Sequence, residues 1–310
     1  MRKTALIAFL GLLVFAASSQ QRPVMSTYMF NGLALNPAYA GSLNIFSASF
    51  LHRKQWINVE GAPTSNIFSM NTSLHGKQLG AGLLATRDVI GVHQESALYI
   101  SGAYKIRTNA GILAMGLSGG FDNRRSNFNE LNILREDDEL LTGVPTRFTP
   151  NFGAGIYFAN PVMYAGISVP YILENKLFNI DDENTISGTV TEARESRYYY
   201  ATGGLIFDIS PNVKLSPSAL IRYQEKSRIG WDLNAMVIFD GIAYAGVSYR
   251  SGDALVFLTQ LILNENFRLG YAYDTTVNAL NESSRGTHEI NLNYRIKLNL
   301  SKDPQCPVYF

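Results

Sequence analysis

The chain has 310 residues, a formal net charge of +1 and only 16% charged residues. Soluble domains typically contain about 25% charged residues, so this composition argues against a soluble protein with charged outer faces. The near-zero net charge argues against a partner such as nucleic acid. Aromatic residues make up 12% of the chain and there are 26 glycines, a composition typical of short strands joined by polar turns.

The N-terminus has the parts of a secretory signal peptide. A basic pair at positions 2 and 3 is followed by the apolar run Ala5–Ala17 and by small residues. This pattern predicts a signal peptide over residues 1–19, cleaved after Ser19. The apolar run is shorter than the roughly 20 residues of a membrane helix. The sequence therefore predicts export from the cytoplasm.

The rest of the sequence predicts strands rather than membrane helices. No later stretch has the length and apolar character of a membrane helix, so a chain placed in a membrane must cross it as a closed barrel. Pro, Gly and Asn punctuate residues 20–42, which predicts an N-terminal periplasmic or lumenal segment. We predict a barrel over residues 43–300 and a C-terminal tail over residues 301–310. The tail contains Cys306, the only cysteine, so no internal disulfide is possible.

Apolar and polar residues alternate along many stretches of the predicted barrel. In residues 289–298, Ile, Leu and Tyr alternate with Glu, Asn and Arg, and residues 213–223, 231–239 and 267–274 show the same period. This two-residue period is typical of a membrane barrel, with apolar side chains toward lipid and polar or small side chains toward the lumen. The pattern predicts about 14 antiparallel strands, near residues 43–55, 64–74, 78–87, 94–105, 110–121, 147–158, 162–170, 198–207, 212–224, 228–239, 242–250, 254–263, 266–274 and 287–299.

The lengths of the connections orient the predicted barrel. Every second connection is short, whereas the others are mostly longer, with the longest at residues 122–146 and 171–197. Outer-membrane barrels have short periplasmic turns and longer surface loops, and usually an even number of strands. We therefore predict an all-β transmembrane barrel of the outer membrane, with both termini in the periplasm and the long loops outside the cell.

The sequence offers no recognisable catalytic or cofactor site. The four histidines are isolated and do not show the spacing of metal ligands. The Gly-Ala-Gly motifs at residues 80–82 and 153–155 fall inside strand patterns, where glycine indicates close packing or a bend. A nucleotide-binding glycine motif requires a following helix. We therefore predict no metal, no cofactor and no enzymatic activity.

Several motifs in order along the chain resemble one family. They are Tyr28-Met29-Phe30-Asn31, Asn36-Pro37-Ala38-Tyr39-Ala40-Gly41, Arg53-Lys54-Gln55-Trp56, Glu60-Gly61-Ala62-Pro63, Tyr249-Arg250-Ser251-Gly252-Asp253-Ala254, Phe267-Arg268-Leu269-Gly270-Tyr271-Ala272-Tyr273-Asp274, and Gly286-Thr287-His288-Glu289-Ile290. With these motifs the chain resembles the PorP/SprF family, outer-membrane proteins of Bacteroidetes associated with type IX secretion and gliding motility. The motifs cover essentially the whole mature chain.

The resemblance implies a role in secretion rather than a reaction. It implies a barrel in outer-membrane lipid that contacts the periplasmic ring of the secretion machinery. It also implies binding of large surface proteins, such as gliding adhesins, through their C-terminal domains, to export or anchor them. The candidate contact residues are Asn31, Asn36, Pro37, Tyr39, Gly41, Arg53, Gln55, Trp56, Gly61, Pro63, Arg250, Gly252 and Asp253.

These candidates divide into two groups by expected position. The first five precede the first strand and are expected in the periplasm or the lumen. The other eight are expected at the outer surface. A purely structural role is the alternative for all of them: Asn-Pro and Gly fix turns, and Arg250 can pair with Asp253 across a short loop.

An outer-membrane channel or small-molecule transporter is the alternative function. A barrel of about 14 strands can hold a pore if its lumen is not plugged. A porin is expected to line its lumen with facing acidic and basic rows. Many of the predicted inward positions are Gly, Ala, Ser or Asn instead, which favours the secretion role.

Overall fold

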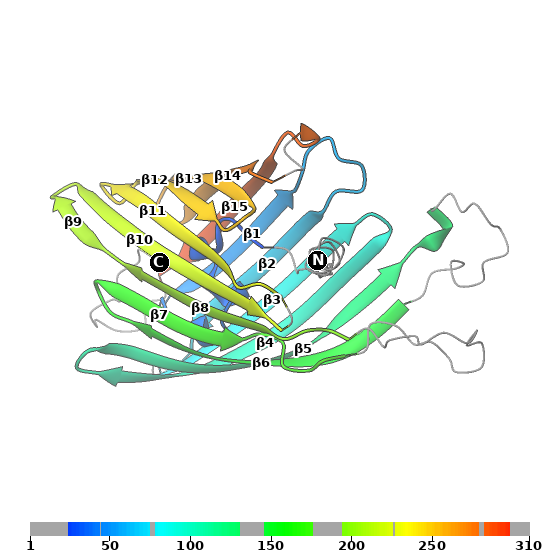
Figure 1. Cartoon of the computed structure of the whole chain (residues 1–310). Coiled ribbons are helices and arrows are strands. Elements are labelled where there is room, and N and C mark those ends of the chain that lie inside the picture. Colours follow the sequence, from blue (N-terminus) through cyan, green and yellow to red (C-terminus); the bar gives the residue numbers. More distant parts are fainter. Residues whose placement is uncertain are drawn as a thin grey trace, which may run out of the picture.

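The strands form one closed antiparallel sheet. The computed structural model describes residues 24–43, 45–74, 78–130, 146–175, 194–225, 227–278 and 282–297. The signal peptide and the tail with Cys306 lie outside these residues. Each strand pairs with its neighbours in sequence, and the first strand pairs with the last, which closes the barrel (Figure 1).

The barrel is built from 15 strand segments. They are β1 (Phe46–Lys54), β2 (Thr64–Ser73), β3 (Leu79–Ile90), β4 (His93–Thr108), β5 (Gly111–Ser126), β6 (Thr146–Ala159), β7 (Met163–Val169), β8 (Tyr198–Leu205), β9 (Phe207–Ser210), β10 (Val213–Gln224), β11 (Gly230–Phe239), β12 (Ala243–Arg250), β13 (Ala254–Ile262), β14 (Phe267–Thr276) and β15 (Thr287–Ile296). Segments β8 and β9 are separated only by Ile206 and both pair with β10, so they are two parts of one strand. This confirms the predicted barrel of 14 strands.

The predicted inner and outer faces are confirmed along the walls. In β15, Glu289 and Asn291 are fully buried, whereas Ile290 and Leu292 are 48% and 42% exposed. Large apolar side chains are exposed in the same way around the barrel, and soluble monomers rarely expose such an extensive apolar surface. The outer wall is therefore a lipid-facing surface, as in outer-membrane barrels.

Three strands are longer than the alternation predicted. β4 and β5 have 16 residues each and β6 has 14, and they extend past the rest of the rim (Figure 1). The predicted loop at residues 88–93 is wrong, because β3 and β4 stay paired up to Ile90 and His93. β5 likewise continues to Ser126, into the predicted loop at residues 122–146. Residues that protrude from the lipid no longer need an apolar outer face. The alternation of apolar and polar residues therefore stops before the strand ends.

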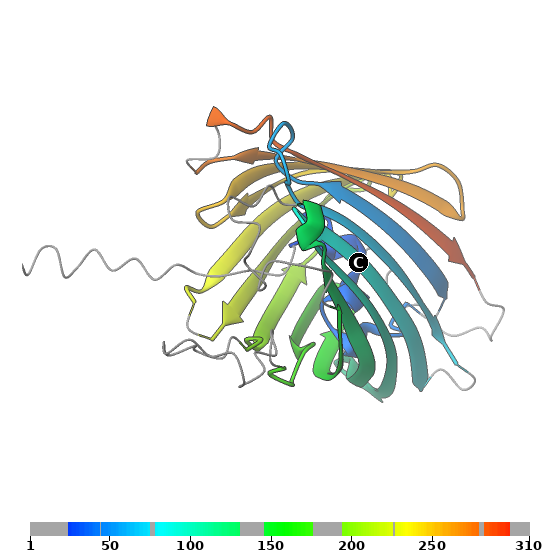
Figure 2. The same ribbon diagram turned by 90° about the vertical axis from the view of Figure 1, so that its right-hand side faces the viewer.

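Residues 24–43 lie inside the barrel. They form three short 3-10 turns, η1 (Tyr28–Phe30), η2 (Gly32–Ala34) and η3 (Pro37–Tyr39), and Figure 2 shows them enclosed by the curved sheet. Turn η4 (Phe128–Glu130) follows β5. No helix among the described residues is long and apolar enough to cross a membrane.

The lumenal segment, residues 24–43, runs from one end of the barrel to the other. Val24 lies beside Asp88 and Arg222, near the ends of β3 and β10. The two longest connections, which follow β5 and β7, lie at this same end of the barrel. Gly41 contacts Ser73 and Gly80, at the end with the short turns. We call these two ends the long-loop end and the short-turn end. The predicted periplasmic position of the termini concerns residues outside the described part of the chain.

Wall glycines make room for the lumenal segment. A Cβ added to Gly80 would lie 1.9 Å from the carbonyl oxygen of Ala40, and one added to Gly155 would lie 2.0 Å from Oδ1 of Asn36. Both contacts are far shorter than van der Waals distance. Glycine at these positions therefore permits a close approach between wall and segment.

Replacing Gly116 by Ala is expected to lower the free energy of unfolding by about 1–3 kcal/mol, the usual cost of overpacking. The added Cβ would lie 2.3 Å from the backbone nitrogen of Ala38. A urea titration of the purified barrel in detergent, read by gel mobility without heating, measures the change. Gly102→Ala is the matched control, because a Cβ at Gly102 would meet nothing within 4 Å. Equal losses in both variants would contradict the tight fit.

Candidate functional site

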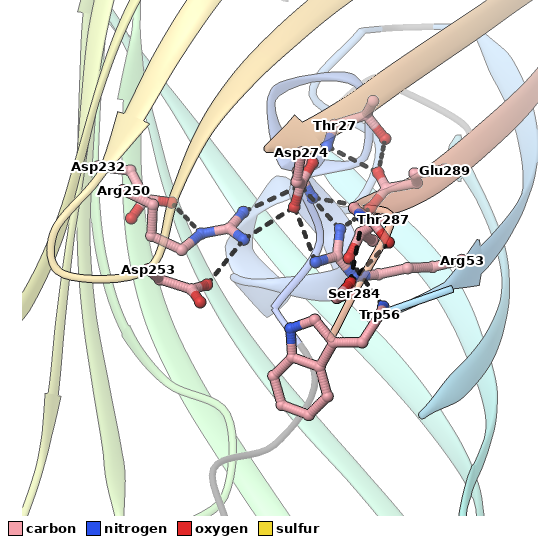
Figure 3. A network of polar contacts seen from close by, with 12 residues as sticks. Thr27, Arg53, Trp56, Asp232, Arg250, Asp253, Asp274, Ser284, Thr287 and Glu289 are labelled. Carbon is pink, nitrogen blue, oxygen red and sulfur yellow. Dashed lines mark hydrogen bonds and ion pairs between the residues drawn. The ribbon is translucent and has the colours of Figure 1, made fainter. Parts of the chain in front are cut away.

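A cluster of charged side chains lies in the lumen near the long-loop end (Figure 3). We call it the lumenal ion cluster. Its members are Arg53, Arg222, Asp232, Arg250, Asp274 and Glu289. Each occupies an inward position near the end of its strand, so the two-residue period sends all six side chains into the barrel. Three guanidinium groups thus face three carboxylates, and none of these six side chains is more than 12% exposed.

Arg53 joins two of the carboxylates. Its Nη2 lies 2.8 Å from Oδ2 of Asp274, and its Nη1 lies 3.0 Å from Oε2 of Glu289. The side chains of all three residues are at most 3% exposed. Charge-assisted hydrogen bonds of this kind are stronger than neutral ones, so Arg53 ties β1 to β14 and β15.

Arg250 connects the same cluster to the opposite wall. Its Nη1 lies 3.1 Å from Oδ2 of Asp274, and its Nε lies 3.4 Å from Oδ2 of Asp232. Asp232 also accepts from Nη2 of Arg222 at 2.7 Å. Arg250 additionally contacts Asp253 at 3.4 Å across the short connection after β12. One network therefore links β10, β11, β12, β14, β15 and β1.

The lumenal segment completes this network with Ser26 and Thr27. The backbone N–H groups of these residues donate to the two carboxylate oxygens of Glu289 at 2.8 and 2.7 Å, and the Thr27 hydroxyl also donates to Glu289. The Ser26 hydroxyl bonds to Asp274 at 2.8 Å and accepts from Arg53 at 2.8 Å and from Arg250 at 3.0 Å. The start of the segment is therefore held by the ion cluster.

Polar contacts fix the rest of the segment along the lumen. The Asn36 amide donates to the carbonyl oxygens of Ile156 at 2.9 Å and Ile167 at 3.3 Å, while its Oδ1 accepts from the Ala38 N–H and caps η3. Nζ of Lys105 donates to the Gly41 carbonyl at 2.6 Å. These bonds satisfy polar groups that would be costly to bury alone.

Aromatic side chains fill the space between these polar contacts. Tyr39 packs edge-on against Tyr157 with ring centroids 5.4 Å apart, and Phe30 packs similarly against Tyr244 at 6.3 Å. Burial raises the pKa of the Tyr28 phenol above its usual range, so this hydroxyl is neutral. Asn31, another of the candidates, accepts from the Ser69 hydroxyl at 2.8 Å.

Two hollows in the lumen are small. One, beside Val24 and Tyr171, has a volume of about 50 Å³, and another, beside Met29 and Tyr39, has about 30 Å³. Such volumes hold a few water molecules. A much larger hollow of about 1200 Å³ lies on the outer wall, beside exposed side chains such as Leu117 and Ile167. The two hollows beside the lumenal segment are therefore far smaller than a pore.

The structure separates the thirteen sequence candidates into four places. Asn31, Asn36, Pro37, Tyr39 and Gly41 lie in the lumenal segment. Gln55, Trp56, Gly61 and Pro63 lie in the connection after β1, and Gly252 and Asp253 lie in the turn after β12. Arg53 and Arg250 were expected at the outer surface, but each is only 2% exposed. Their side chains point inward because both residues stand at lumen-facing positions in the alternation of β1 and β12.

Turn geometry accounts for several of the loop candidates. Gly61 and Gly252 have φ values of 70° and 68°, which favour glycine. The Trp56 N–H donates to the hydroxyl of Thr287 at 3.1 Å, and the Gln55 N–H donates to the Pro63 carbonyl at 2.9 Å. These bonds close the connection after β1 over the ion cluster.

The pairing of Arg250 with Asp253 that the sequence suggested is present at 3.4 Å, but sequence reasoning missed the other partners of the two arginines. Asp232, Asp274 and Glu289 fell on predicted inward faces, which was the available signal for a charged lumenal site. Ser26 and Thr27 gave no such signal, because their carboxylate partners, Asp274 and Glu289, are more than 240 residues away in the sequence. Among the described residues, no group of three His, Cys, Asp or Glu side chains is arranged to hold a metal ion.

Comparisons with known proteins complete this description. The sequence profile of a family described as "Type IX secretion system membrane protein PorP/SprF" matches residues 17–294. A comparison with curated protein sequences gives no match.

Solved structures with a similar fold include outer-membrane proteins of low sequence identity. The outer membrane protein Omp33 of Acinetobacter baumannii has a TM-score of 0.46 at 9% identity, covering 83% of this chain and 100% of that one. The CymD monoaromatic hydrocarbon channel has a TM-score of 0.47 at 11% identity, covering 85% and 91%. A Pseudomonas aeruginosa FadL homologue has a TM-score of 0.42 at 10% identity, covering 82% and 89%.

Proposed function

Because this chain belongs to the PorP/SprF family of type IX secretion system membrane proteins, we propose that it is a closed, non-enzymatic docking barrel of the outer membrane. In this proposal it binds the C-terminal domains of large secreted surface proteins and helps to export or anchor them. The observation that carries the proposal is the lumenal segment, which fills the barrel from end to end. A filled barrel acts through its rims and loops rather than through a pore.

The proposed docking surface lies on the protruding part of β5 and β6. Phe121 and Phe148 stack there on the outer face with ring centroids 4.6 Å apart, and Phe148 is 63% exposed. Aromatic side chains are common anchors at protein interfaces. A rigid sheet that projects beyond the rim, flanked by long connections, suits recognition of a folded domain.

The proposal includes a second contact at the short-turn end. With the predicted orientation, this end faces the periplasm, where ring components of the secretion machinery are within reach. The alternative function, an outer-membrane channel or small-molecule transporter, requires a continuous water path through the barrel. The packing of aromatic residues between segment and wall disfavours it.

Replacing Phe148 by Ser is expected to reduce cargo recovery about tenfold or more, since truncating an aromatic hot spot costs about 2 kcal/mol or more of binding free energy. The measurement is a pull-down of the tagged full chain from detergent-solubilised outer membranes, read by quantitative mass spectrometry. Recovery of a large secreted protein through its C-terminal domain with the unmodified chain supports the proposal.

Phe239→Ser is the matched control. Phe239 is 46% exposed on the outer face, but it lies at the short-turn end of β11. Cargo recovery should be unchanged in this variant. Recovery of the barrel alone, under conditions that keep other membrane complexes intact, would contradict the docking role.

A further inference from the structure

One sector of the outer wall carries basic rather than aromatic side chains near the long-loop end. Strands β15, β1, β2 and β3 are adjacent there, and we call the set His52, Lys54, Arg87 and His288 the basic wall patch. In the strand register, Lys54 is opposite His288, and His52 is opposite Asn66, which is in turn opposite Arg87. Residues directly opposite on one face are neighbours, so these side chains form one continuous polar surface.

The outer wall changes from apolar to basic side chains between one outward row of residues and the next. The next outward row toward the short-turn end contains Leu292, Phe50, Phe68 and Ala85, in register across the four strands. The first three are 42%, 46% and 38% exposed. Apolar side chains of this exposure face the hydrocarbon, so the basic wall patch lies where lipid headgroups begin.

The positive charge of the patch is not neutralised by the wall. No acidic residue occupies an outward position of the four strands. Their two acidic residues, Asp88 and Glu289, stand at inward positions. Within the described residues, Lys54 and Arg87 form no ion pair. His52 bonds through Nδ1 to Oδ1 of Asn66 at 2.9 Å, and His288 bonds through Nδ1 to the hydroxyl of Tyr271 at 2.6 Å.

Elsewhere on the barrel, the outer wall near the long-loop end carries aromatic side chains. Tyr199 and Tyr223 pack at 5.9 Å, and Trp231 and Tyr249 pack at 5.5 Å between ring centroids. These outward rings resemble the aromatic girdle of membrane barrels. At the edge of the basic wall patch, His288 packs against Tyr271 and Tyr273 of β14, with ring centroids 6.0 and 5.1 Å apart. The patch begins where these outward rings end, and its positive charge points to a ligand with negative charge.

We propose that the basic wall patch binds the phosphate group of an outer-leaflet lipid, with the acyl chains lying along Phe50 and Phe68. The ammonium group of Lys54 and the guanidinium group of Arg87 are suited to phosphate oxygens, and the apolar row beneath accepts hydrocarbon. A phosphorylated glycolipid and an anionic phospholipid both carry such a phosphate group. The site is separate from the ion cluster and from the proposed docking surface.

The test uses the full chain in detergent, titrated with defined lipids and followed by native mass spectrometry. The probes are bisphosphorylated lipid A, dephosphorylated lipid A and phosphatidylglycerol. The variant Lys54→Gln/Arg87→Gln is expected to bind the phosphorylated lipids on the order of ten-fold more weakly, the loss expected for about 1.4 kcal/mol. The control is Arg107→Gln/Lys297→Gln, which removes one arginine and one lysine exposed at the short-turn end.

The outcomes separate the two lipid sources and the competing explanations. Loss confined to lipid A identifies a glycolipid site, and loss for both phosphorylated lipids identifies a general phosphate site. Equal affinity for phosphorylated and dephosphorylated lipid A, or an equal loss in the control, would overturn the proposal. Unchanged lipid affinity with reduced cargo recovery would overturn it in favour of an acidic protein partner.

Discussion

Replacing Glu289 by Ala is expected to lower the free energy of unfolding by about 3–5 kcal/mol, the cost of breaking a buried ion pair by removing one partner. The substitution leaves Arg53 with one carboxylate fewer and removes the acceptor of the Ser26 and Thr27 N–H groups. Urea unfolding of the purified barrel, followed by gel mobility without heating, measures the loss. Digestion with chymotrypsin gives a second readout, because Tyr28 becomes accessible if the segment loosens.

Asp208→Asn is the control for this prediction. Asp208 also pairs with a cation, Lys214 at 2.6 Å, but its side chain is 74% exposed at the short-turn end. Exposed ion pairs contribute little to stability, so the control should unfold like the unmodified protein. If Glu289→Ala also unfolds like the unmodified protein, the ion cluster does not hold the segment.

Deleting residues 24–42 is expected to convert a barrel without measurable conductance into one that conducts ions. The deletion removes the aromatic and polar groups that fill the lumen of a 14-stranded barrel, which is wide enough to hold a pore. Single-channel recordings in planar bilayers measure the change. A synthetic peptide of residues 24–43, added to the deletion variant, should reduce the conductance again.

A milder variant guards against failure of the deletion variant to fold. Tyr28→Ala/Tyr39→Ala shortens two large side chains of the lumenal segment. It leaves in place the bonds of the segment to the ion cluster and the bond from Asn36 to the Ile156 carbonyl. Intermittent conductance is expected from this variant. Steady conductance by the unmodified protein would contradict the closed lumen and favour the channel alternative.

The strands could be predicted because lipid and lumen impose opposite demands on alternate residues. All 14 strands were placed, since each wall residue is either exposed to hydrocarbon or enclosed. The rule fails where a strand leaves the membrane, as in β5, where Asp122 and Arg124 are still paired with β6. After Phe121, polar side chains such as Asn123 and Arg125 occupy the outer face of β5, and the period-two signal disappears.

The candidate site could be predicted only in part. Alternation placed Asp274 and Glu289 on inward faces, but their meeting with Arg53 depends on strand register and barrel closure. The turn residues around Asn36 and Pro37 were visible in the sequence. That they line the lumen depends on glycines at positions 80, 116 and 155, whose role appears only when segment and wall are seen together.

The ties between Ser26, Thr27 and Glu289 impose an order on the assembly of the barrel. Glu289 belongs to β15, the last strand to be synthesised, whereas Ser26 and Thr27 precede the first strand. The start of the lumenal segment therefore cannot reach its final contacts until the C-terminal strand has paired with β1. Pairing of β15 with β1 and attachment of the lumenal segment to Glu289 therefore occur together, late in assembly. In a chain truncated before β15, the start of the lumenal segment would lack these contacts.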